Sequence, residues 1–189
     1  AAALEVFSEK GYHNVSMREI AERADFAIGT VYKFFKNKED LYKTLIMAKA
    51  EEYHQMLREV LTREDDVLTV LKDYIGAKAK IFADNIAALR LYFAETRGAS
   101  FNIKAGLDRD IRVLYDESIE ALASLLKAGI RKKVIRKLDP HQMAVALEGM
   151  TTAFLFRWFQ APQQHPYDAD VPAIIGMFLD GVSAKRQGH

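Results

Sequence analysis

The sequence predicts an all-α protein of about nine helices, arranged as an N-terminal three-helix domain (residues 1–45) and a larger helical domain (residues 46–189). Three observations support this prediction. Hydrophobic residues recur every three or four positions along most of the 189-residue chain, which is the spacing of one helix face. Only four prolines and ten glycines interrupt the pattern, and no stretch alternates as a strand does. Half of the residues are hydrophobic, so the chain can bury a substantial core.

Composition excludes several classes of site. The chain contains no cysteine, which excludes a disulfide framework, a thiolate zinc site and a cysteine nucleophile. It also fits the reducing cytoplasm, where we expect the protein to act. No apolar run reaches the roughly 18 residues of a membrane span, so no membrane partner is expected. The chain starts without a methionine and inside a helical pattern, so we expect further residues in front of it.

The first two helices are predicted from the signals at their ends. Residues 1–10 form the first helix, and Gly11 follows it as a left-handed C-cap. Ser16 and Glu19 form an S-x-x-E capping box, which starts the second helix. Residues 25–27 then form a turn. This layout is that of a helix-turn-helix, a motif whose second helix lies in a DNA major groove.

The third helix runs from Ile28 to about Phe35 and would present the surface that reads DNA. We expect its exposed residues to be Ile28, Thr30, Val31, Tyr32 and Lys33, with Gly29 allowing close approach. Hydroxyl groups suit phosphate oxygens, which set the register of a protein on DNA. An isoleucine or valine side chain can contact a thymine methyl group, and a lysine can reach a guanine edge.

The remaining helices follow from apolar stripes and start signals. Asn37 is the expected N-cap of the fourth helix, and Asp139 followed by Pro140 is a strong start signal for a later one. The predicted spans are residues 38–61, 66–82, 85–97, 102–131, 140–159 and 171–185. Residues 161–170, with two prolines, are predicted to be a loop.

Charge is distributed unevenly although the net charge is only +1. Five lysines stand between residues 33 and 49 against two acidic residues: Lys33, Lys36, Lys38, Lys43 and Lys49. Such a stripe suits phosphate binding. By charge alone, an ordinary solvated helix face is the better interpretation.

The residues from Phe7 to Leu41 include F-x-E-K-G-Y, S-M-R-E-I-A-x-x-A and G-T-V-Y-x-x-F-x-N-K-E-D-L. This string resembles the DNA-binding domain of the TetR family of bacterial transcriptional regulators. The resemblance implies a ligand-responsive repressor that binds a palindromic double-stranded operator as a homodimer, with no cofactor. It also implies phosphate contacts from Ser16, Thr30, Tyr32 and Lys38, with Ile28 and Lys33 near bases. The full set of predicted DNA-binding residues is Ser16, Met17, Ala27, Ile28, Gly29, Thr30, Tyr32, Lys33, Lys36 and Lys38.

The sequence departs from the family pattern at three positions. Asp25 stands where the turn usually has a glycine, so a left-handed backbone would cost more there. Ala27 replaces a capping serine or threonine, at a cost of about 1 kcal/mol. Phe34 replaces a histidine or tyrosine that could contact a phosphate. The family's basic N-terminal arm also does not occur in this chain.

The larger domain resembles the family's effector and dimerisation domain. The helix over residues 140–159 is apolar on nearly every side, so it needs two faces to bury. Burial at the centre of a monomer is the alternative to a dimer. The predicted dimer residues are Met143, Leu147, Met150, Leu155, Ile174, Phe178 and Val182. The predicted pocket for a small apolar or amphipathic effector is lined by Phe82, Leu89, Tyr92, Phe93, Thr96, Arg97, Tyr115, Ile119, Thr151, Phe154 and Trp158.

Two other classes of protein are alternatives to a regulator. One is a helical enzyme, but the five histidines show no ligand spacing and no catalytic motif is present, so we expect no catalytic residue and no metal site. The other is a helical interaction module that does not bind DNA. That interpretation explains the apolar helix but not the placement of Gly29, Thr30, Tyr32 and Lys38.

Overall fold

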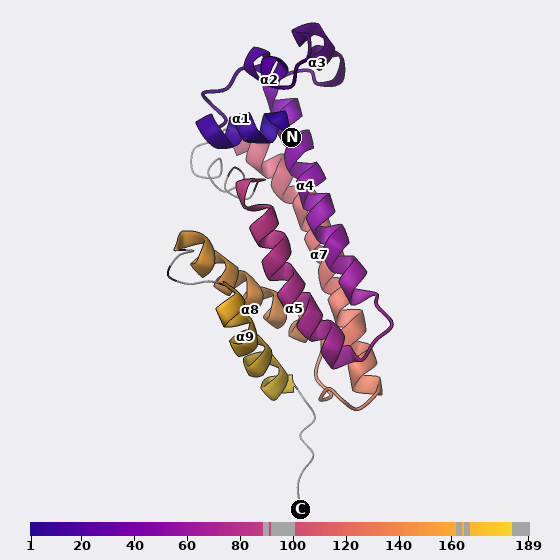
Figure 1. Ribbon diagram of the computed structural model, residues 1–189. Helices are drawn as coiled ribbons and strands as arrows, with labels where there is room; N and C mark the ends of the chain where they lie inside the picture. Colours follow the sequence, from indigo (N-terminus) through magenta and orange to yellow (C-terminus); the bar gives the residue numbers. More distant parts are fainter. Residues whose placement is uncertain (89–90, 92–100, 162–163, 165–166, 183–189) are drawn as a thin grey trace, which may run out of the picture. The chain divides into compact units, whose positions relative to one another are not determined.

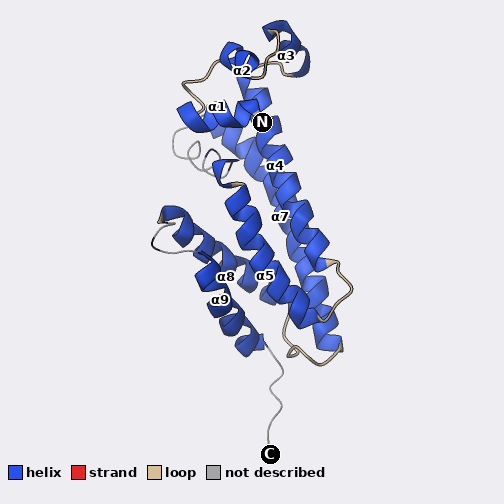
Figure 2. Ribbon diagram, viewed as in Figure 1, coloured by secondary structure: helices blue, strands red, loops and turns tan. Residues whose placement is uncertain are grey.

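The computed structural model describes residues 1–88, 91, 101–161, 164 and 167–182. Within these residues the chain is helical and contains no strand, as predicted (Figures 1 and 2). The helices are α1 (Ala2–Lys10), α2 (Met17–Arg23), α3 (Ile28–Phe34), α4 (Lys38–Leu61), α5 (Val67–Asp84), α7 (Phe101–Arg131), α8 (Pro140–Gln160) and α9 (Tyr167–Val182). Most of the helix predicted over residues 85–97 lies outside the described residues. No helix in the described ranges is long and apolar enough to cross a membrane.

The chain packs as two compact units. The first contains residues 1–53 and 84–114, and the second contains residues 54–83 and 115–189. α4 and α7 each run through both units. This division by packing differs from the predicted boundary after residue 45. It falls within α4 and α7, which continue from one unit into the other without a linker.

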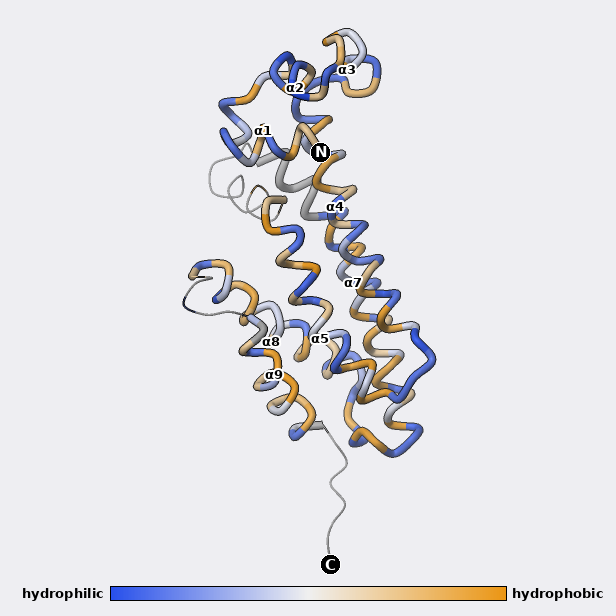
Figure 3. Tube along the Cα trace, in the orientation of Figure 1, coloured by the Kyte–Doolittle hydropathy of each residue, from blue (hydrophilic) through white to orange (hydrophobic). Residues whose placement is uncertain are grey.

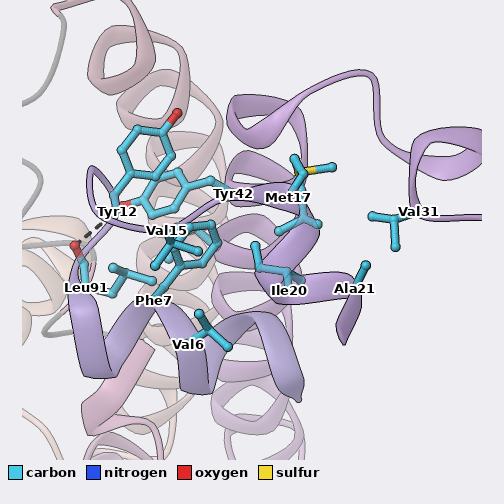
Figure 4. Packing of buried hydrophobic residues seen from close by; sticks show 12 residues of the cluster. Val6, Phe7, Tyr12, Val15, Met17, Ile20, Ala21, Val31, Tyr42 and Leu91 are labelled. Atoms are coloured by element: carbon cyan, nitrogen blue, oxygen red, sulfur yellow. Dashed lines mark hydrogen bonds between the residues drawn. The ribbon is translucent and has the colours of Figure 1, made fainter. Parts of the chain in front are cut away.

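Aromatic side chains form the centre of the first unit (Figure 4). The Phe7 ring lies 5.7 Å from each of the Tyr12 and Tyr42 rings, and those two are 5.0 Å apart. The Tyr42 hydroxyl donates to the Leu91 carbonyl over 3.4 Å. These contacts bury α1 and the following loop against α4, which gives the short helices a core they could not form alone.

Local end signals decide most helix boundaries. The capping box at Ser16 and Glu19 is present, and the Asp139 carboxylate accepts from the Gln142 amide, with Pro140 next in the chain. Gly11 differs from the prediction. Its φ of 74° requires glycine, but its ψ of 160° is extended, so it ends α1 without a left-handed helical turn.

The start of α9 also differs from the prediction. The helix begins at Tyr167, inside the predicted loop, and Pro172 lies within it. Pro172 is the sixth residue of the helix, so one backbone hydrogen bond is lost. The side chain of Tyr167 is buried, and its packing favours a helix that starts before the proline. Hydrophobic residues dominate α9 (Figure 3).

Candidate nucleic-acid interface

The entry to α2 is held by reciprocal hydrogen bonds. The Glu19 amide donates to the Ser16 hydroxyl over 3.2 Å, and the Ser16 amide donates to the Glu19 carboxylate over 3.3 Å. The Lys10 ammonium also pairs with this carboxylate. The bond from Lys10, followed by that from Ser16, lowers the pKa of Glu19. The box therefore stays ionised at neutral pH and leaves the Ser16 side chain exposed at the surface.

The turn between α2 and α3 has the two weaknesses that the sequence predicted. Asp25 has a φ of 57°, the left-handed conformation that glycine adopts more easily. Ala27 is the N-cap of α3 and makes no side-chain cap bond. The turn is closed instead by the Phe26 amide, which donates to the Ala21 carbonyl over 2.9 Å.

α3 presents part of the predicted reading face. Ile28 and Tyr32 are exposed, by 38% and 53%, as are Gly29 and Lys33. Thr30 is half-buried. The reading face therefore combines apolar contact, a phenolic hydroxyl and one cation.

Two predicted contact residues point inward instead. Val31 was expected on the exposed face, and Met17 was among the DNA-binding residues, but both side chains are buried in the core of the first unit (Figure 4). Helices as short as α2 and α3 stay packed on that core only by burying apolar side chains in it.

Sequence reasoning missed two exposed phenylalanines beside this face. Phe34, at the end of α3, is 74% exposed, and Phe26, before its start, is 60% exposed. Both border an apolar hollow of about 350 Å³ in the first unit. Phe34 replaces a residue type that could contact a phosphate. The structure shows that it also adds apolar surface.

The basic stripe is smaller than its lysine count indicates. Lys43 and Lys49 each pair with a glutamate of α4, over 2.7 and 2.5 Å. The Lys38 ammonium is bonded to main-chain carbonyls. In the described part of the chain, only Lys33 and Lys36 among the five have no such partner.

The described members of the predicted effector pocket lie in the second unit. Phe82 is buried, and its ring lies 5.9 Å from that of Trp158. Ile119 and Thr151 are buried, and the remaining two, Tyr115 and Phe154, are half-buried. Leu89, Tyr92, Phe93, Thr96 and Arg97 lie outside the described residues.

A buried polar cluster in this unit was not predicted. The Lys78 ammonium, with only 1% of the side chain exposed, pairs with the Glu148 carboxylate and donates to the Thr151 hydroxyl over 2.7 Å. The Tyr74 hydroxyl donates to Glu148 over 2.8 Å. Burial raises the pKa of Glu148, but the charge of Lys78 and the hydrogen bonds from Lys78 and Tyr74 together hold it below its usual value. The signal was available, because Lys78 follows Leu71 and Tyr74 at helical spacing on the apolar face of α5.

The predicted dimer residues are mostly buried within the single chain. Met143, Leu147, Leu155, Ile174 and Phe178 are buried, and Met150 is half-buried. The side chain of Val182 lies outside the described residues. Among the described side chains of α8 and α9, the exposed large apolar ones are instead Val145, Phe156 and Met177.

The fold and the exposed face of α3 define a helix-turn-helix protein of the kind that binds DNA. Residues 1–45 match the family model described as "Bacterial regulatory proteins, tetR family". The match covers about the first quarter of the chain, and the relatives found are transcriptional regulators.

Three relatives illustrate the similarity. The HTH-type transcriptional regulator RutR of Escherichia coli is 29% identical over 144 residues, which are 76% of this chain and 65% of RutR. The solved structure of the fatty acid degradation regulator FadR from Bacillus halodurans has a TM-score of 0.76 at 25% identity, covering 95% of this chain and 92% of that one. Bacillus subtilis FadR in complex with stearoyl-CoA has a TM-score of 0.76 at 23% identity, covering 95% of each chain.

Proposed function

We propose that this regulator is a repressor that binds a palindromic operator as a homodimer in the cytoplasm and is released by an apolar or amphipathic effector. The observation that carries the proposal is the capped helix-turn-helix whose α3 exposes Ile28, Tyr32 and Lys33. The Tyr32 hydroxyl and Lys33 serve phosphate or base contacts, and Ile28 serves thymine methyl groups.

DNA binding is tested by gel shift with the DNA upstream of the protein's own gene, at about 50 and 200 mM salt. We expect a complex that weakens as salt rises. Tyr32→Ala and Lys33→Ala should weaken it, whereas Lys72→Ala, which removes an exposed lysine of the second unit, should not. Absence of any salt-sensitive complex would exclude the regulator.

We further propose that α8 and α9 form the dimer interface through their exposed apolar side chains. Val145 and Met177 are the anchors, because each exposes a large side chain that water solvates poorly. The small residues Ala146, Gly149 and Ala153, which are exposed on α8, permit close helix approach. A hollow of about 320 Å³, bordered by Ala146 and Met177, would receive side chains of the second copy.

Sedimentation velocity tests this interface. Met177→Glu should convert the dimer to a monomer and reduce operator affinity. Val113→Glu is the matched control, because Val113 is a similarly exposed apolar residue on α7. An undissociated Met177→Glu dimer would place the interface elsewhere.

The effector is proposed to carry a long acyl chain. The second unit contains a group of aromatic side chains, in which the Phe82 ring lies 5.9 Å from the Trp158 ring and 6.5 Å from the Phe159 ring. A few polar residues are close to these aromatic residues in the sequence. Ligand sites commonly combine apolar walls with a few polar groups in this way. The relative solved with stearoyl-CoA supports this class of ligand.

Stearoyl-CoA, stearate and coenzyme A are the probes for this part of the proposal. Stearoyl-CoA should raise the melting temperature and release the operator. A ligand acts only through its different affinities for the two states, here by changing the separation of the two α3 helices from the roughly 34–36 Å of one DNA turn. If none of the three changes operator affinity, the proposed effector class is wrong.

A further inference from the structure

The side chain of Lys38, the first residue of α4, ends in a cage of main-chain oxygens. Its ammonium donates to the carbonyls of Tyr12 and Val15, each over 2.8 Å, and to that of His13 over 3.3 Å. The same nitrogen lies 4.5 Å from the centre of the Tyr12 ring. The three carbonyls belong to the loop between α1 and α2, more than twenty residues earlier in the chain.

The cage occupies the whole donor capacity of the ammonium. A lysine ammonium has three N–H groups, and three carbonyls accept from this one. A phosphate oxygen could be bound only if one of these bonds broke. The phosphate contact that the family resemblance implies for Lys38 therefore has no donor in this structure.

The loop that Lys38 holds leads directly into the helix-turn-helix. Val15 is buried and precedes Ser16, the N-cap of α2. At the other end of the motif, the Lys36 amide donates to the Asp40 carboxylate over 2.9 Å. The first turn of α4 thus forms hydrogen bonds both with the loop before α2 and with the residues after α3.

We propose that Lys38 is a positioning residue for operator binding, which fixes the entry of α2 to α4 and makes no phosphate contact of its own. This inference rests on the proposed DNA-binding function. It assigns the phosphate-facing charge to Lys33 and Lys36, whose ammonium groups have no hydrogen-bond or ion-pair partner among the described residues.

Two substitutions at Lys38 separate positioning from phosphate contact. Arginine binds phosphate at least as well as lysine, but its planar guanidinium does not match three oxygens that converge on one tetrahedral ammonium. Positioning therefore predicts that Lys38→Arg and Lys38→Met both weaken operator affinity about tenfold or more. A phosphate contact predicts an Lys38→Arg affinity within about twofold of the wild type.

The salt dependence of operator affinity distinguishes the two roles independently, because its slope depends on the number of phosphate contacts and not on how well the helices are positioned. Each phosphate contact contributes about 0.9 to the slope of log affinity against log salt, so two copies contribute about 1.8. Lys38→Met should leave the slope unchanged at a temperature where every variant is folded. Lys36→Met, the matched loss of one exposed lysine, should reduce it. A lower slope for Lys38→Met, or full rescue by Lys38→Arg, would overturn the inference.

Thermal unfolding in the absence of DNA tests whether the hydrogen bonds of the cage stabilise the protein. Loss of charge-assisted hydrogen bonds should lower the melting temperature of both Lys38 variants by about 4 °C or more, whereas Lys36→Met should not change it. If the wild type forms no salt-sensitive complex, the proposed function fails on its own. If the melting temperatures of the Lys38 variants equal that of the wild type, the cage fails.

Discussion

Acidification should destabilise the protein through one buried histidine. His54 lies on α4 in the second unit, is 8% exposed, and has its Nδ1 atom 2.7 Å from the Ser118 hydroxyl oxygen. Burial lowers the pKa of His54 from 6.5 to about 4, while Glu148 opposes the shift and Arg58 adds to it. The folded protein therefore holds the imidazole neutral over a range in which the unfolded chain protonates it.

The sign and size of the effect follow from this difference. Between pH 6.5 and about 4 the unfolded state binds more protons at His54 than the folded state does, so the free energy of unfolding falls as the pH falls. At 1.36 kcal/mol per pKa unit, the full effect below pH 4 is about 3 kcal/mol. At pH 5.5 it is about 1.4 kcal/mol, and at pH 7.5 it is close to zero.

Urea unfolding followed by circular dichroism at pH 7.5 and 5.5 measures this loss. His54→Gln keeps a hydrogen-bonding side chain but cannot titrate, so the wild type should lose about 1.4 kcal/mol more than this variant between the two pH values. His141→Gln, which removes an exposed histidine, is the control substitution. Equal losses in the wild type and His54→Gln would refute the reasoning.

Further substitutions test the packing in the same unfolding assay. Lys78→Met leaves the Glu148 charge buried without its partner and should cost about 3–5 kcal/mol; adding Glu148→Leu should restore much of that stability, and simple addition of the two costs would contradict it. Gly129→Ala places a Cβ 2.6 Å from a buried isoleucine side chain and should destabilise by about 1–3 kcal/mol. Gly76→Ala, where nothing lies within 4 Å, should instead stabilise by about 1 kcal/mol. Asp25→Gly relieves a φ of 57° and should raise stability by about 0.5–1 kcal/mol, so a lower melting temperature would show that Asp25 contributes in another way.

The sequence predicted best what depends on neighbouring residues. The capping box at Ser16 and the N-cap at Asn37, whose side chain accepts from the Asp40 amide over 2.8 Å, are set within one helical turn. The start of α4 followed from the same kind of signal. The exposed face of α3 was predicted in part, because its polar and small residues are neighbours in the sequence and can be recognised without knowledge of distant contacts.

Features that depend on distant partners were missed. Lys78 is paired with Glu148, 70 residues further along the chain, and no local pattern reports such a pair. Lys38 is bonded to backbone carbonyls, which every residue carries, so its partners leave no mark in the sequence. Val31 and Met17 were misplaced for a related reason: which face of a very short helix is buried depends on the core it meets.

The continuity of α4 predicts how a ligand signal would travel. The helix holds the helix-turn-helix through Lys38 at its first residue and carries His54 in its part that belongs to the second unit. The double variant Ala48→Gly and Ala50→Gly would soften the helix between these points by about 1 kcal/mol per site. Because the cage at Lys38 stays intact, operator affinity should remain close to that of the wild type, whereas release by stearoyl-CoA should weaken. Gel shifts with and without stearoyl-CoA measure both quantities. Unchanged release in the double variant would mean that the coupling runs through α7, another helix that belongs to both units.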